Sequence, residues 1–293
     1  MNTAVLLAGC GDVGLRAGLE LAAAGRRVYG LRRSADALPA PLVTLRADLT
    51  DPASLCELPD DIADVVFLPA PGQRDEAAYR GLFISGLAHL LDALHARTAL
   101  RRLIFVSSSA VYGEHAGAWI DEDTPCAPLA FNGRLLLEAE QRLAGMNRAG
   151  ANRAGANRAI VARCSGIYGP GRQRLLNQVV DGSARRPAGA PEFSNRIHVD
   201  DAAGALVHLL GVEQPQDCYL VSDDHPAPLA EVQEWMAGQL ALPPPPYEPA
   251  PGPRAVGNKR LSNRRLRATG YALRFPDYRA GYAPLLRGVR GQG

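Results

Sequence analysis

Three glycines near the amino end of the sequence have a spacing that can bind phosphate groups. Gly9, Gly11 and Gly14 follow an apolar run at residues 4–8 and open an amphipathic segment at residues 13–24. In such a turn the first glycine allows a sharp bend, the second lets the backbone approach a pyrophosphate, and the third lets the next helix pack closely on the strand. Free N–H groups at the helix start then face the phosphates. This context favours a nucleotide site over an ordinary glycine-rich turn, and it predicts a dinucleotide contacting Gly9, Cys10, Gly11, Asp12, Val13 and Gly14.

The end of the second predicted strand indicates which dinucleotide is bound. Sites for NAD usually place Asp or Glu there to bind the ribose 2′-hydroxyl, whereas arginine accommodates the 2′-phosphate of NADP. This strand ends in Arg32 and Arg33, and no acidic residue follows before Asp36. We therefore expect NADP(H) to be favoured over NAD(H). The alternative is that both arginines are solvated surface charges.

Charge and hydropathy exclude several other partners. The chain of 293 residues has 32 Lys plus Arg against 30 Asp plus Glu, which gives a formal net charge of +2. So small an excess cannot create the broad positive field that binding to a nucleic-acid backbone requires. No stretch approaches the ~18 uninterrupted apolar residues of a membrane span, and the short apolar start lacks the basic residues of a signal peptide. We expect a cytoplasmic protein that binds a small molecule, and neither nucleic acid nor a membrane.

The cysteines indicate neither a disulfide framework nor a metal site. They are odd in number and scattered without metal-ligand spacing. We expect reduced thiols and no bound metal at Cys10, Cys56, Cys126, Cys164 and Cys218.

The first half of the chain alternates short apolar runs with helical patterns, as parallel α/β sheets do. The near-continuous hydrophobic character of the runs is typical of strands that are covered on both faces. Strands are predicted at residues 4–8, 27–31, 42–46, 65–68, 103–107 and 160–163, and helices at 13–24, 76–96 and 134–144. This pattern predicts an α/β fold with a doubly wound parallel sheet, the Rossmann arrangement.

After about residue 166 proline and glycine become frequent, and a smaller C-terminal substrate lobe is predicted. We expect helices at residues 173–182, 201–210 and 229–240 and strands at 197–199 and 218–221. Residues 1–165 would form the NAD(P)-binding domain, and residues 166–293 would form mainly the lobe, with 197–211 returning to the nucleotide domain.

A five-residue repeat, Asn-Arg-Ala-Gly-Ala, begins at Asn147 and recurs at Asn152 and Asn157. A period of five matches neither a helix nor a strand. Residues 147–158 are therefore predicted to be a surface loop, and deletion of residues 147–156 is expected to leave folding and nucleotide binding intact.

Several segments together resemble the extended short-chain dehydrogenase/reductase superfamily, the group of NAD-dependent epimerases and dehydratases. The resemblance covers most of the chain, and its specificity comes from the order and spacing of the segments. They are the glycine turn, Ala47-Asp48-Leu49, the Ser107-Ser108-Ser109-Ala110-Val111-Tyr112-Gly113 stretch, Ser165-Gly166-Ile167-Tyr168-Gly169-Pro170-Gly171 and Arg196-Ile197-His198-Val199-Asp200-Asp201. The segments at residues 258–263 and 275–278 further resemble a small bacterial branch of atypical members.

The resemblance implies roles for individual residues. Asp48 and Leu49 would contact the adenine, Leu68, Pro69 and Ala70 would lie beside a cofactor ribose, and Ser107 would belong to the cofactor site. Ser108 matches the catalytic Ser/Thr of the family, whereas Ser109, Tyr168, Arg196 and His198 would face the substrate lobe. Two alternatives remain open: Asp48 could cap a helix, and Ser108 could be a turn hydroxyl.

The sequence departs from the family at its Tyr-x-x-x-Lys pair, in which the tyrosine acts as the general acid and base. If the following family glutamate is Glu140, the two positions are Asn132 and Leu136; if it is Glu138, they are Ala130 and Arg134. Neither alignment contains a tyrosine, and neither Asn nor Ala exchanges a proton near neutral pH. Nearby phenols that could substitute are Tyr112 and Tyr168.

Further departures narrow the reaction. Ser109 and Ala110 stand where sugar 4,6-dehydratases of the family carry Asp-Glu, which disfavours water elimination. Ser194 stands where members that bind nucleotide-sugars often have arginine, although Arg196 could partly replace it. His198 is interpreted as a positioning turn and N-cap of the next helix rather than as an acid or base.

Two functions are compatible with these residues. We favour an NADP-dependent oxidoreductase or epimerase-like enzyme that uses Ser108 and an unconventional proton donor. The alternative is a catalytically silent NADP(H)-binding sensor or scaffold. A homodimer formed through residues 76–96 and 134–144 is conceivable, but their apolar faces could equally belong to the internal core.

Overall fold

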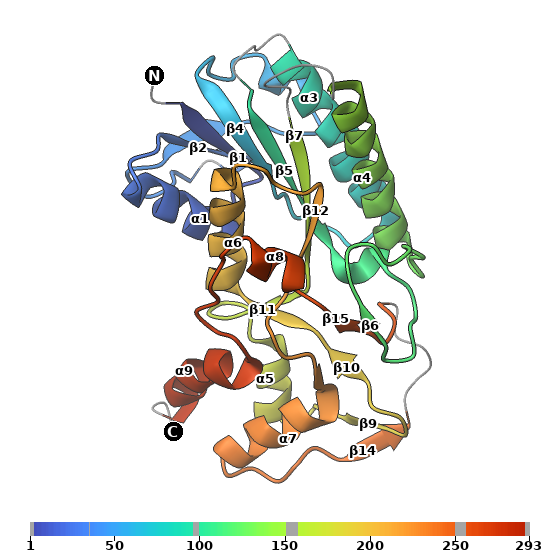
Figure 1. Cartoon of the computed structure of the whole chain (residues 1–293). Helices are drawn as coiled ribbons and strands as arrows, with labels where there is room; N and C mark the ends of the chain where they lie inside the picture. Colours follow the sequence, from blue (N-terminus) through green and yellow to red (C-terminus); the bar gives the residue numbers. More distant parts are fainter. Residues whose placement is uncertain (1–2, 35, 96–99, 151–157, 250–255, 291–293) are drawn as a thin grey trace.

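The computed structural model describes residues 3–34, 36–95, 100–150, 158–249 and 256–290 (Figure 1). Its centre is a seven-stranded sheet with the order β12-β7-β5-β4-β1-β2-β3, and every neighbouring pair is parallel. The strands are β1 (Ala4–Ala8), β2 (Val28–Arg32), β3 (Val43–Arg46), β4 (Ile62–Phe67), β5 (Arg102–Ser108), β7 (Arg158–Cys164) and β12 (Cys218–Val221). The doubly wound parallel sheet predicted from the sequence is confirmed.

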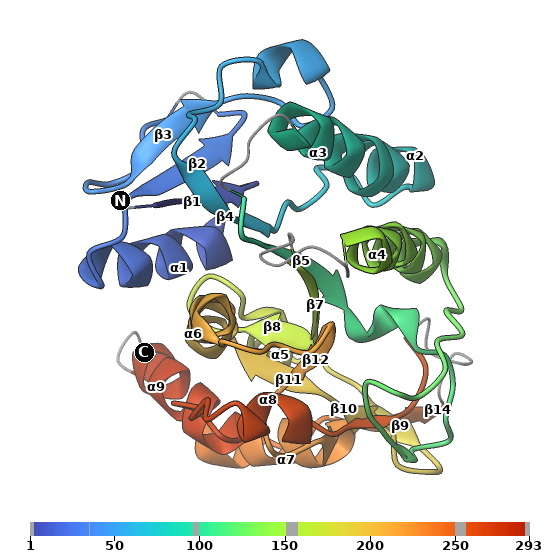
Figure 2. The same cartoon turned by 45° about the horizontal axis from the view of Figure 1, so that its top comes forward.

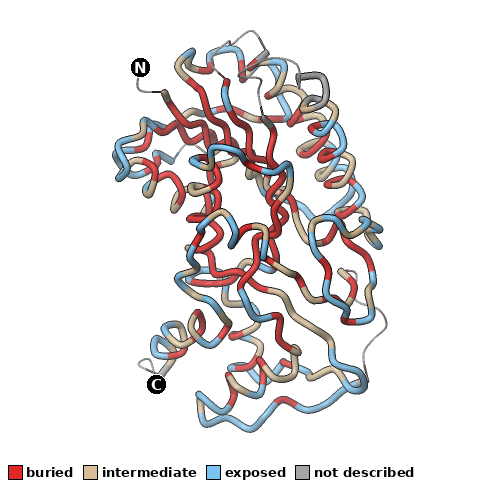
Figure 3. Tube along the Cα trace, in the orientation of Figure 1, coloured by how far each residue is buried: buried red, intermediate tan, exposed pale blue. Residues whose placement is uncertain are grey.

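Helices cover both faces of the sheet (Figure 2), which explains why β1 and β4 at its centre are buried along their whole length. One face packs on α1 (Asp12–Ala23) and α6 (Val199–Gly211). The other packs on α2 (Glu76–Tyr79), the π-helical turn η2 (Arg80–Gly86), α3 (Leu87–His95) and α4 (Phe131–Gly150). The apolar faces of α3 and α4 thus contribute to the core of the same chain, and Figure 3 shows the strands of the sheet as the most continuously buried part of the fold.

A smaller lobe lies beyond the carboxyl ends of the strands (Figure 1). Its apolar core unites α5 (Arg174–Val180), α7 (Leu229–Gln239) and α9 (Tyr278–Arg290). Short strand pairs frame it: β8 (Gly166–Tyr168) with β11 (Arg196–His198), β9 (Arg186–Ala188) with β14 (Tyr247–Pro249), and β10 (Phe193–Ser194) with β13 (Ala227–Pro228). The remaining elements are η1 (Pro52–Leu55), η3 (Ser109–Val111), β6 (Trp119–Ile120), β15 (Arg260–Leu261) and α8 (Arg264–Ala268).

The structure corrects two expectations about chain organisation. The segment Cys218–Val221, assigned to the lobe, is β12 and pairs with β7 at the edge of the central sheet. The repeat is also not a loop at its start, because α4 continues to Gly150 and Arg158 already belongs to β7. Asn147 bonds both backbone groups of Ala159 at 2.8 Å, so deleting it would break the connection between α4 and β7. Residues 151–157 of the repeat lie outside the described residues.

Among the described residues, no helix is long and apolar enough to cross a membrane.

Candidate cofactor and substrate site

A cleft of about 920 Å³ opens at the carboxyl ends of β1, β2 and β4. In the sheet, β2 lies on one side of β1 and β4 lies on its other side, so the strand order reverses at β1, where the cleft opens. Open α/β sheets bind ligands at such a switch point. Its walls include the glycine turn, Arg32, Arg33, Asp48, Leu49, Leu68, Pro69, Ala70 and Val106.

The three glycines of the turn have different structural tasks. Gly9 has φ +87°, and a Cβ there would lie 2.4 Å from the Cα of Pro69. A Cβ on Gly14 would lie 3.2 Å from Leu68 Cδ1, which explains the close packing of α1. A Cβ on Gly11, in contrast, would meet no protein atom within 4 Å. Gly9 is thus required by the fold, whereas Gly11 leaves its space to the cleft.

The start of α1 is open to a negatively charged ligand. Its N-cap is Gly11, and no side chain bonds the first N–H groups of the helix. Such N–H groups, together with the helix dipole, favour phosphate oxygens. A dinucleotide therefore fits the turn on steric and on electrostatic grounds.

Cys10 lies in the same turn but has no reactive character. Its sulfur lies beneath the helix, 3.3 Å from a Cβ built on Gly14. Burial raises the pKa of the thiol to about 11, so it stays protonated at neutral pH.

Two arginines lie at the end of β2, at the edge of the cleft: Arg32 is the last residue of the strand, and Arg33 follows it. Arg33 is exposed, and its Nη2 lies 3.7 Å from a Cβ built on Gly72 in the loop after β4. Arg32 is half-buried. Within the described ranges neither guanidinium forms an ion pair with a carboxylate, so both charges are available to a ligand phosphate.

Asp48 lines the cleft and is not a helix cap. Its Oδ1 accepts hydrogen bonds from the N–H and the hydroxyl of Thr50, at 2.9 and 2.8 Å. Asp51 is the N-cap of η1 instead. The capping alternative for Asp48 is therefore wrong.

A second cavity, of about 360 Å³, adjoins the cleft on the side of the lobe. The two share Ile167 and Arg172 in their walls, so they are direct neighbours. The second cavity brings together four residues that the sequence analysis assigned to the active site or the lobe, namely Ser108, Ser109, Tyr168 and Arg196. It also contains residues that the sequence analysis did not single out as site residues: Ser165, Arg172, Arg174, Asn195, Lys259 and Tyr282.

Ser108 combines the two roles considered for it. Its Oγ accepts a hydrogen bond from the N–H of Ala110 at 3.2 Å and caps η3, as a turn hydroxyl does. The same side chain lines the second cavity. Because the oxygen accepts from the backbone, the hydroxyl hydrogen can be donated to a ligand.

Ser107 and Tyr112 lie behind the site, in a buried network. Ser107 donates to Glu140 at 2.5 Å, and Arg163 pairs with the same carboxylate at 2.6 Å. Arg163 also donates to the hydroxyl of Tyr112 at 2.6 Å, and this hydroxyl donates to the carbonyl of Asp121. Neither Ser107 nor Tyr112 lines the cleft or the second cavity. Burial also raises the pKa of Tyr112. Because its members bond one another and lie outside both cavities, the network holds the sheet to α4 and does not contact a ligand.

The inward position of Glu140 favours one of the two alignments of the missing catalytic pair. Glu140 is buried against β5, whereas Glu138 is half-buried and pairs with Arg142. The family positions of Tyr and Lys then fall on Asn132 and Leu136. Neither side chain lines the second cavity.

The two remaining candidates, His198 and Tyr168, make contacts that stabilise the fold. His198 is buried, caps α6 by accepting from the N–H of Asp200, and has a pKa lowered by burial. Its prediction as an N-cap is confirmed. Tyr168 stacks on Tyr282 with ring centroids 4.3 Å apart, and its hydroxyl donates to the carbonyl of Asp277 at 3.4 Å. Burial raises the pKa of Tyr168.

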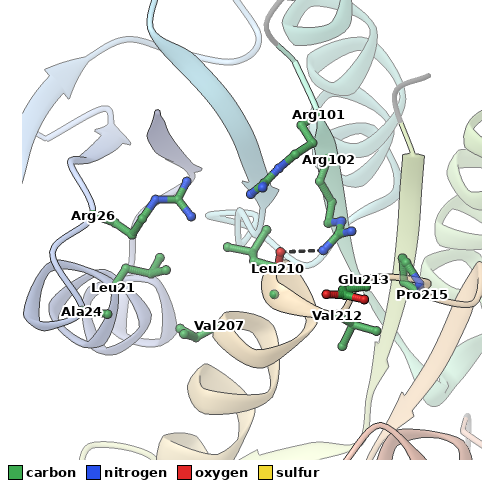
Figure 4. A pocket seen from close by; sticks show the side chains of 11 residues that line it. Leu21, Ala24, Arg26, Arg101, Arg102, Val207, Leu210, Val212, Glu213 and Pro215 are labelled. Atoms are coloured by element: carbon green, nitrogen blue, oxygen red, sulfur yellow. Dashed lines mark hydrogen bonds between the residues drawn. The ribbon is translucent and has the colours of Figure 1, made fainter. Parts of the chain in front are cut away.

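A third cavity, of about 680 Å³, lies at the opposite edge of the sheet, near the amino ends of the strands (Figure 4). Arg26 and Arg101 point toward one another, and both bond Asp64, at 2.7 and 2.6 Å. Arg102 points instead to the end of α6, where it donates to the carbonyls of Leu209 and Leu210. Each of the three arginines is thus bonded to the protein.

Comparison with known proteins agrees with this geometry. The sequence profile of the NAD dependent epimerase/dehydratase family matches residues 5–220. The chain belongs to this family. The protein is thus an NAD(P)-binding protein of the epimerase/dehydratase type, as the glycine turn and the later segments predicted.

Three individual proteins are similar to this chain. A Methylobacillus flagellatus protein assigned to the NAD-dependent epimerases/dehydratases is 36% identical, with a TM-score of 0.79 over 99% of this chain and 100% of its own. MoeE5, solved with UDP-glucuronic acid and NAD, is 25% identical, with a TM-score of 0.81 over 99% and 100% of the chains. A Streptomyces 3-diazoavenalumate denitrifying reductase is 32% identical over 184 residues, which are 59% of this chain and 57% of that reductase.

Proposed function

We propose that this protein is an NADP(H)-dependent reductase that acts on a small molecule held in the second cavity. The observation that carries the proposal is that the two cavities are neighbours and share Ile167 and Arg172 in their walls. A dinucleotide in the cleft would present its reactive end to a substrate beside Ser108. Bound NADPH would supply a hydride to an electrophilic atom of that substrate.

The residues that would hold the cofactor follow from the cleft. The N–H groups after Gly11 bind the pyrophosphate, and Arg32 and Arg33 bind the 2′-phosphate. Asp48 and Leu49 border the adenine end, and Leu68, Pro69 and Ala70 border the opposite wall. The unpaired state of both arginines in the described chain supports NADP(H) over NAD(H).

The side chains of the second cavity favour reduction over epimerisation. Epimerisation by oxidation and re-reduction needs a base that removes a hydroxyl proton from the substrate. The aligned positions, Asn132 and Leu136, contain no such base. Reduction in one direction leaves an alkoxide, which the Ser108 hydroxyl can stabilise with a hydrogen bond and which takes its proton from solvent water. The name of the Streptomyces relative, a denitrifying reductase, supports the same choice.

The proposal is tested by following NADPH absorbance with aldehydes, ketones and aryl diazo compounds as oxidants. We expect consumption of NADPH with at least one class, and a rate for Ser108→Ala that is lower by about 10². The matched control is Ser85→Ala, which replaces a half-buried serine of η2 that lines neither cavity. Nucleotide binding without turnover of any oxidant, or an unchanged rate for Ser108→Ala, would overturn the reductase.

A catalytically silent NADP(H)-binding sensor is the second candidate, and the absent Tyr and Lys favour it. It predicts tight nucleotide binding with no turnover in the same assay. Full NADPH affinity together with turnover that depends on Ser108 excludes it.

A further inference from the structure

The wall of the second cavity is strongly cationic. Arg172, Arg174, Arg196 and Lys259 all line it, and its described lining contains no aspartate or glutamate. Two of the four are buried, since Arg196 is 6% exposed and Lys259 is 2% exposed. Lys259 is already bonded within the protein, because its Nζ donates to the carbonyl of Val256. Buried charges are costly unless an opposite charge or hydrogen-bond acceptors compensate them. A cavity of this composition attracts an anion.

Arg196 needs such an anion most clearly. Throughout the described ranges no carboxylate lies within ion-pair distance of its guanidinium. Asp223 is the acidic group that interacts with it, but burial raises the pKa of Asp223 to about 8. Its carboxyl group lies beyond ion-pair distance of the Arg196 guanidinium, so the charge of Arg196 has no paired carboxylate among the described residues.

Ser165 provides an independent observation. It is 5% exposed, lines the same cavity, and its Oγ has no hydrogen-bond partner among the described residues. Buried hydroxyl groups without a partner are uncommon in folded proteins. An acceptor oxygen of a ligand in the cavity would satisfy it.

The wall that bears Lys259 is held in place by side-chain bonds. The amide group of Asn195 donates to the carbonyl of Lys259 and accepts from the N–H of Leu261, at 2.9 and 2.8 Å. Asn258 accepts from the N–H of Phe193 at 2.8 Å. These bonds fix the loop carrying the sole lysine of the sequence against β10 and β11. The site is therefore preorganised before a ligand arrives.

Size and shape decide the kind of anion. A volume of about 360 Å³ is near the lower end for small-molecule sites, which leaves little room for a nucleotide-sugar. The rings of Tyr168, Tyr282 and Phe193 supply apolar walls for a planar carbon framework. Two acceptor oxygens of one carboxylate would match the guanidinium of Arg196 and the hydroxyl of Ser165.

We infer that the second cavity binds a small planar carboxylate, with Arg196, Lys259 and Ser165 as its anion site. The inference rests on the proposed function, because the carboxylate would be carried by the molecule that is reduced. It adds the chemical class of that molecule and separates it from the nucleotide-sugars bound by relatives such as MoeE5.

Calorimetric titration of the full chain with benzoate tests the inference, with benzamide as the neutral isostere. Benzoate is expected to bind at least about tenfold more tightly than benzamide, and Arg196→Gln is expected to lose about tenfold or more in benzoate affinity. Lys259→Met and Ser165→Ala should each weaken benzoate binding as well. Arg287→Gln, on the exposed side of α9 in the same lobe, is the charge-matched control and should bind benzoate like the parent.

NADPH affinity, measured on the same variants, separates this inference from the proposed function. If NADPH binds normally but benzoate and benzamide bind equally or not at all, the carboxylate site is refuted while the nucleotide site stands. Tighter binding of inorganic phosphate or of UDP than of benzoate, abolished by Arg196→Gln, would also refute it. If benzoate binds as expected and NADPH does not, the anion site stands and the reductase fails.

Discussion

The Nε of Arg172 lies 3.0 Å from the Oδ2 of Asp12, and this ion pair joins the loop after β8 to the glycine turn. Arg172 borders both cavities, so the pair links the cofactor cleft to the substrate lobe. Asp12 also accepts from Arg16, which in turn bonds Asp200 at the start of α6. A chain of charged groups thus runs from the nucleotide turn to the lobe.

Replacing Arg172 should affect ligand binding more than folding. Exposed ion pairs contribute about 0–1 kcal/mol to stability, so the free energy of unfolding of Arg172→Gln should change by less than about 1 kcal/mol. Loss of its positive charge beside the phosphate site should weaken NADPH binding several-fold, most strongly at low salt. Arg279→Gln, which breaks a similar pair with Glu231, is the control. Equal NADPH affinities of the two variants would contradict this role.

The glycine turn permits a test that separates folding from binding. Gly11→Ala should fold normally, because its methyl group meets no protein atom within 4 Å and Gly11 has φ −94°. The same methyl group should obstruct the pyrophosphate and lower NADPH affinity by about tenfold or more. Gly9→Ala should instead destabilise the fold by about 1–3 kcal/mol, because of its positive φ and its contact with Pro69. Titration and denaturant unfolding measure the two effects; normal NADPH affinity in Gly11→Ala would disprove the assigned pyrophosphate site.

Cofactor choice should depend on Arg33. A charged hydrogen bond to the 2′-phosphate contributes about 1.5–3 kcal/mol, so Arg33→Ala should lose at least about tenfold in NADPH affinity. NADH affinity should change by less than about twofold, because NADH lacks that phosphate. Arg27→Ala, at the opposite end of β2, is the control for charge. A parallel loss of both nucleotides would show that Arg33 does not read the 2′-phosphate.

Asp223 should make the protein less stable as the pH rises. Its pKa in the folded state is raised to about 8 by burial, well above the value of about 3.9 expected in the unfolded chain. Between these two pH values the folded state holds more protons, so the free energy of unfolding falls as the pH increases. Asp223→Asn should remove this decline, and its advantage over the parent should grow to the order of a few kcal/mol by pH 8. Urea unfolding at pH 5, 6.5 and 8 measures the free energy of unfolding of both proteins. If this free energy changed with pH in the same way in both, the raised pKa of Asp223 would be refuted.

The buried pair of Arg163 and Glu140 should be important for stability. Removing one partner of a buried ion pair leaves an uncompensated charge and costs about 3–5 kcal/mol. Glu140→Ala should therefore unfold at much lower urea concentration than the parent. Glu138→Ala, two residues earlier in α4 and half-buried, should change stability by less than about 1 kcal/mol. Similar midpoints for the two variants would show that the network is not structural.

The sequence predicted individual strands and helices better than it predicted which distant segments lie side by side in the fold. The strands β1 to β5 and β7 were predicted, because each is a mainly apolar run in a chain that alternates such runs with helices. β12 is equally apolar, but its partner β7 lies more than fifty residues earlier, so it was assigned to the lobe. The start of the repeat was predicted as a loop because its period is not helical, yet the bonds of Asn147 to Ala159 hold it in α4.

The candidate site shows the same limit. The glycine turn and the arginines after β2 are local in sequence, and all of them border the cleft. Ser107 and Ser108 are adjacent, and only the direction of each side chain along β5 places Ser107 against Glu140 and Ser108 in the cavity. The cationic wall joins residues from three distant segments at 172–174, 196 and 259. Arg196 was predicted through the segment that begins with it, whereas Arg172, Arg174 and Lys259 were not singled out from the sequence.

A crystal structure of the protein with NADPH tests the central claim most directly. We predict the pyrophosphate at the start of α1, the 2′-phosphate beside Arg32 and Arg33, and the nicotinamide next to Ile167, open to the cavity that contains Ser108 and Arg196. A nucleotide bound elsewhere, such as in the cavity of Figure 4, would contradict the account, as would a nicotinamide turned away from Ser108.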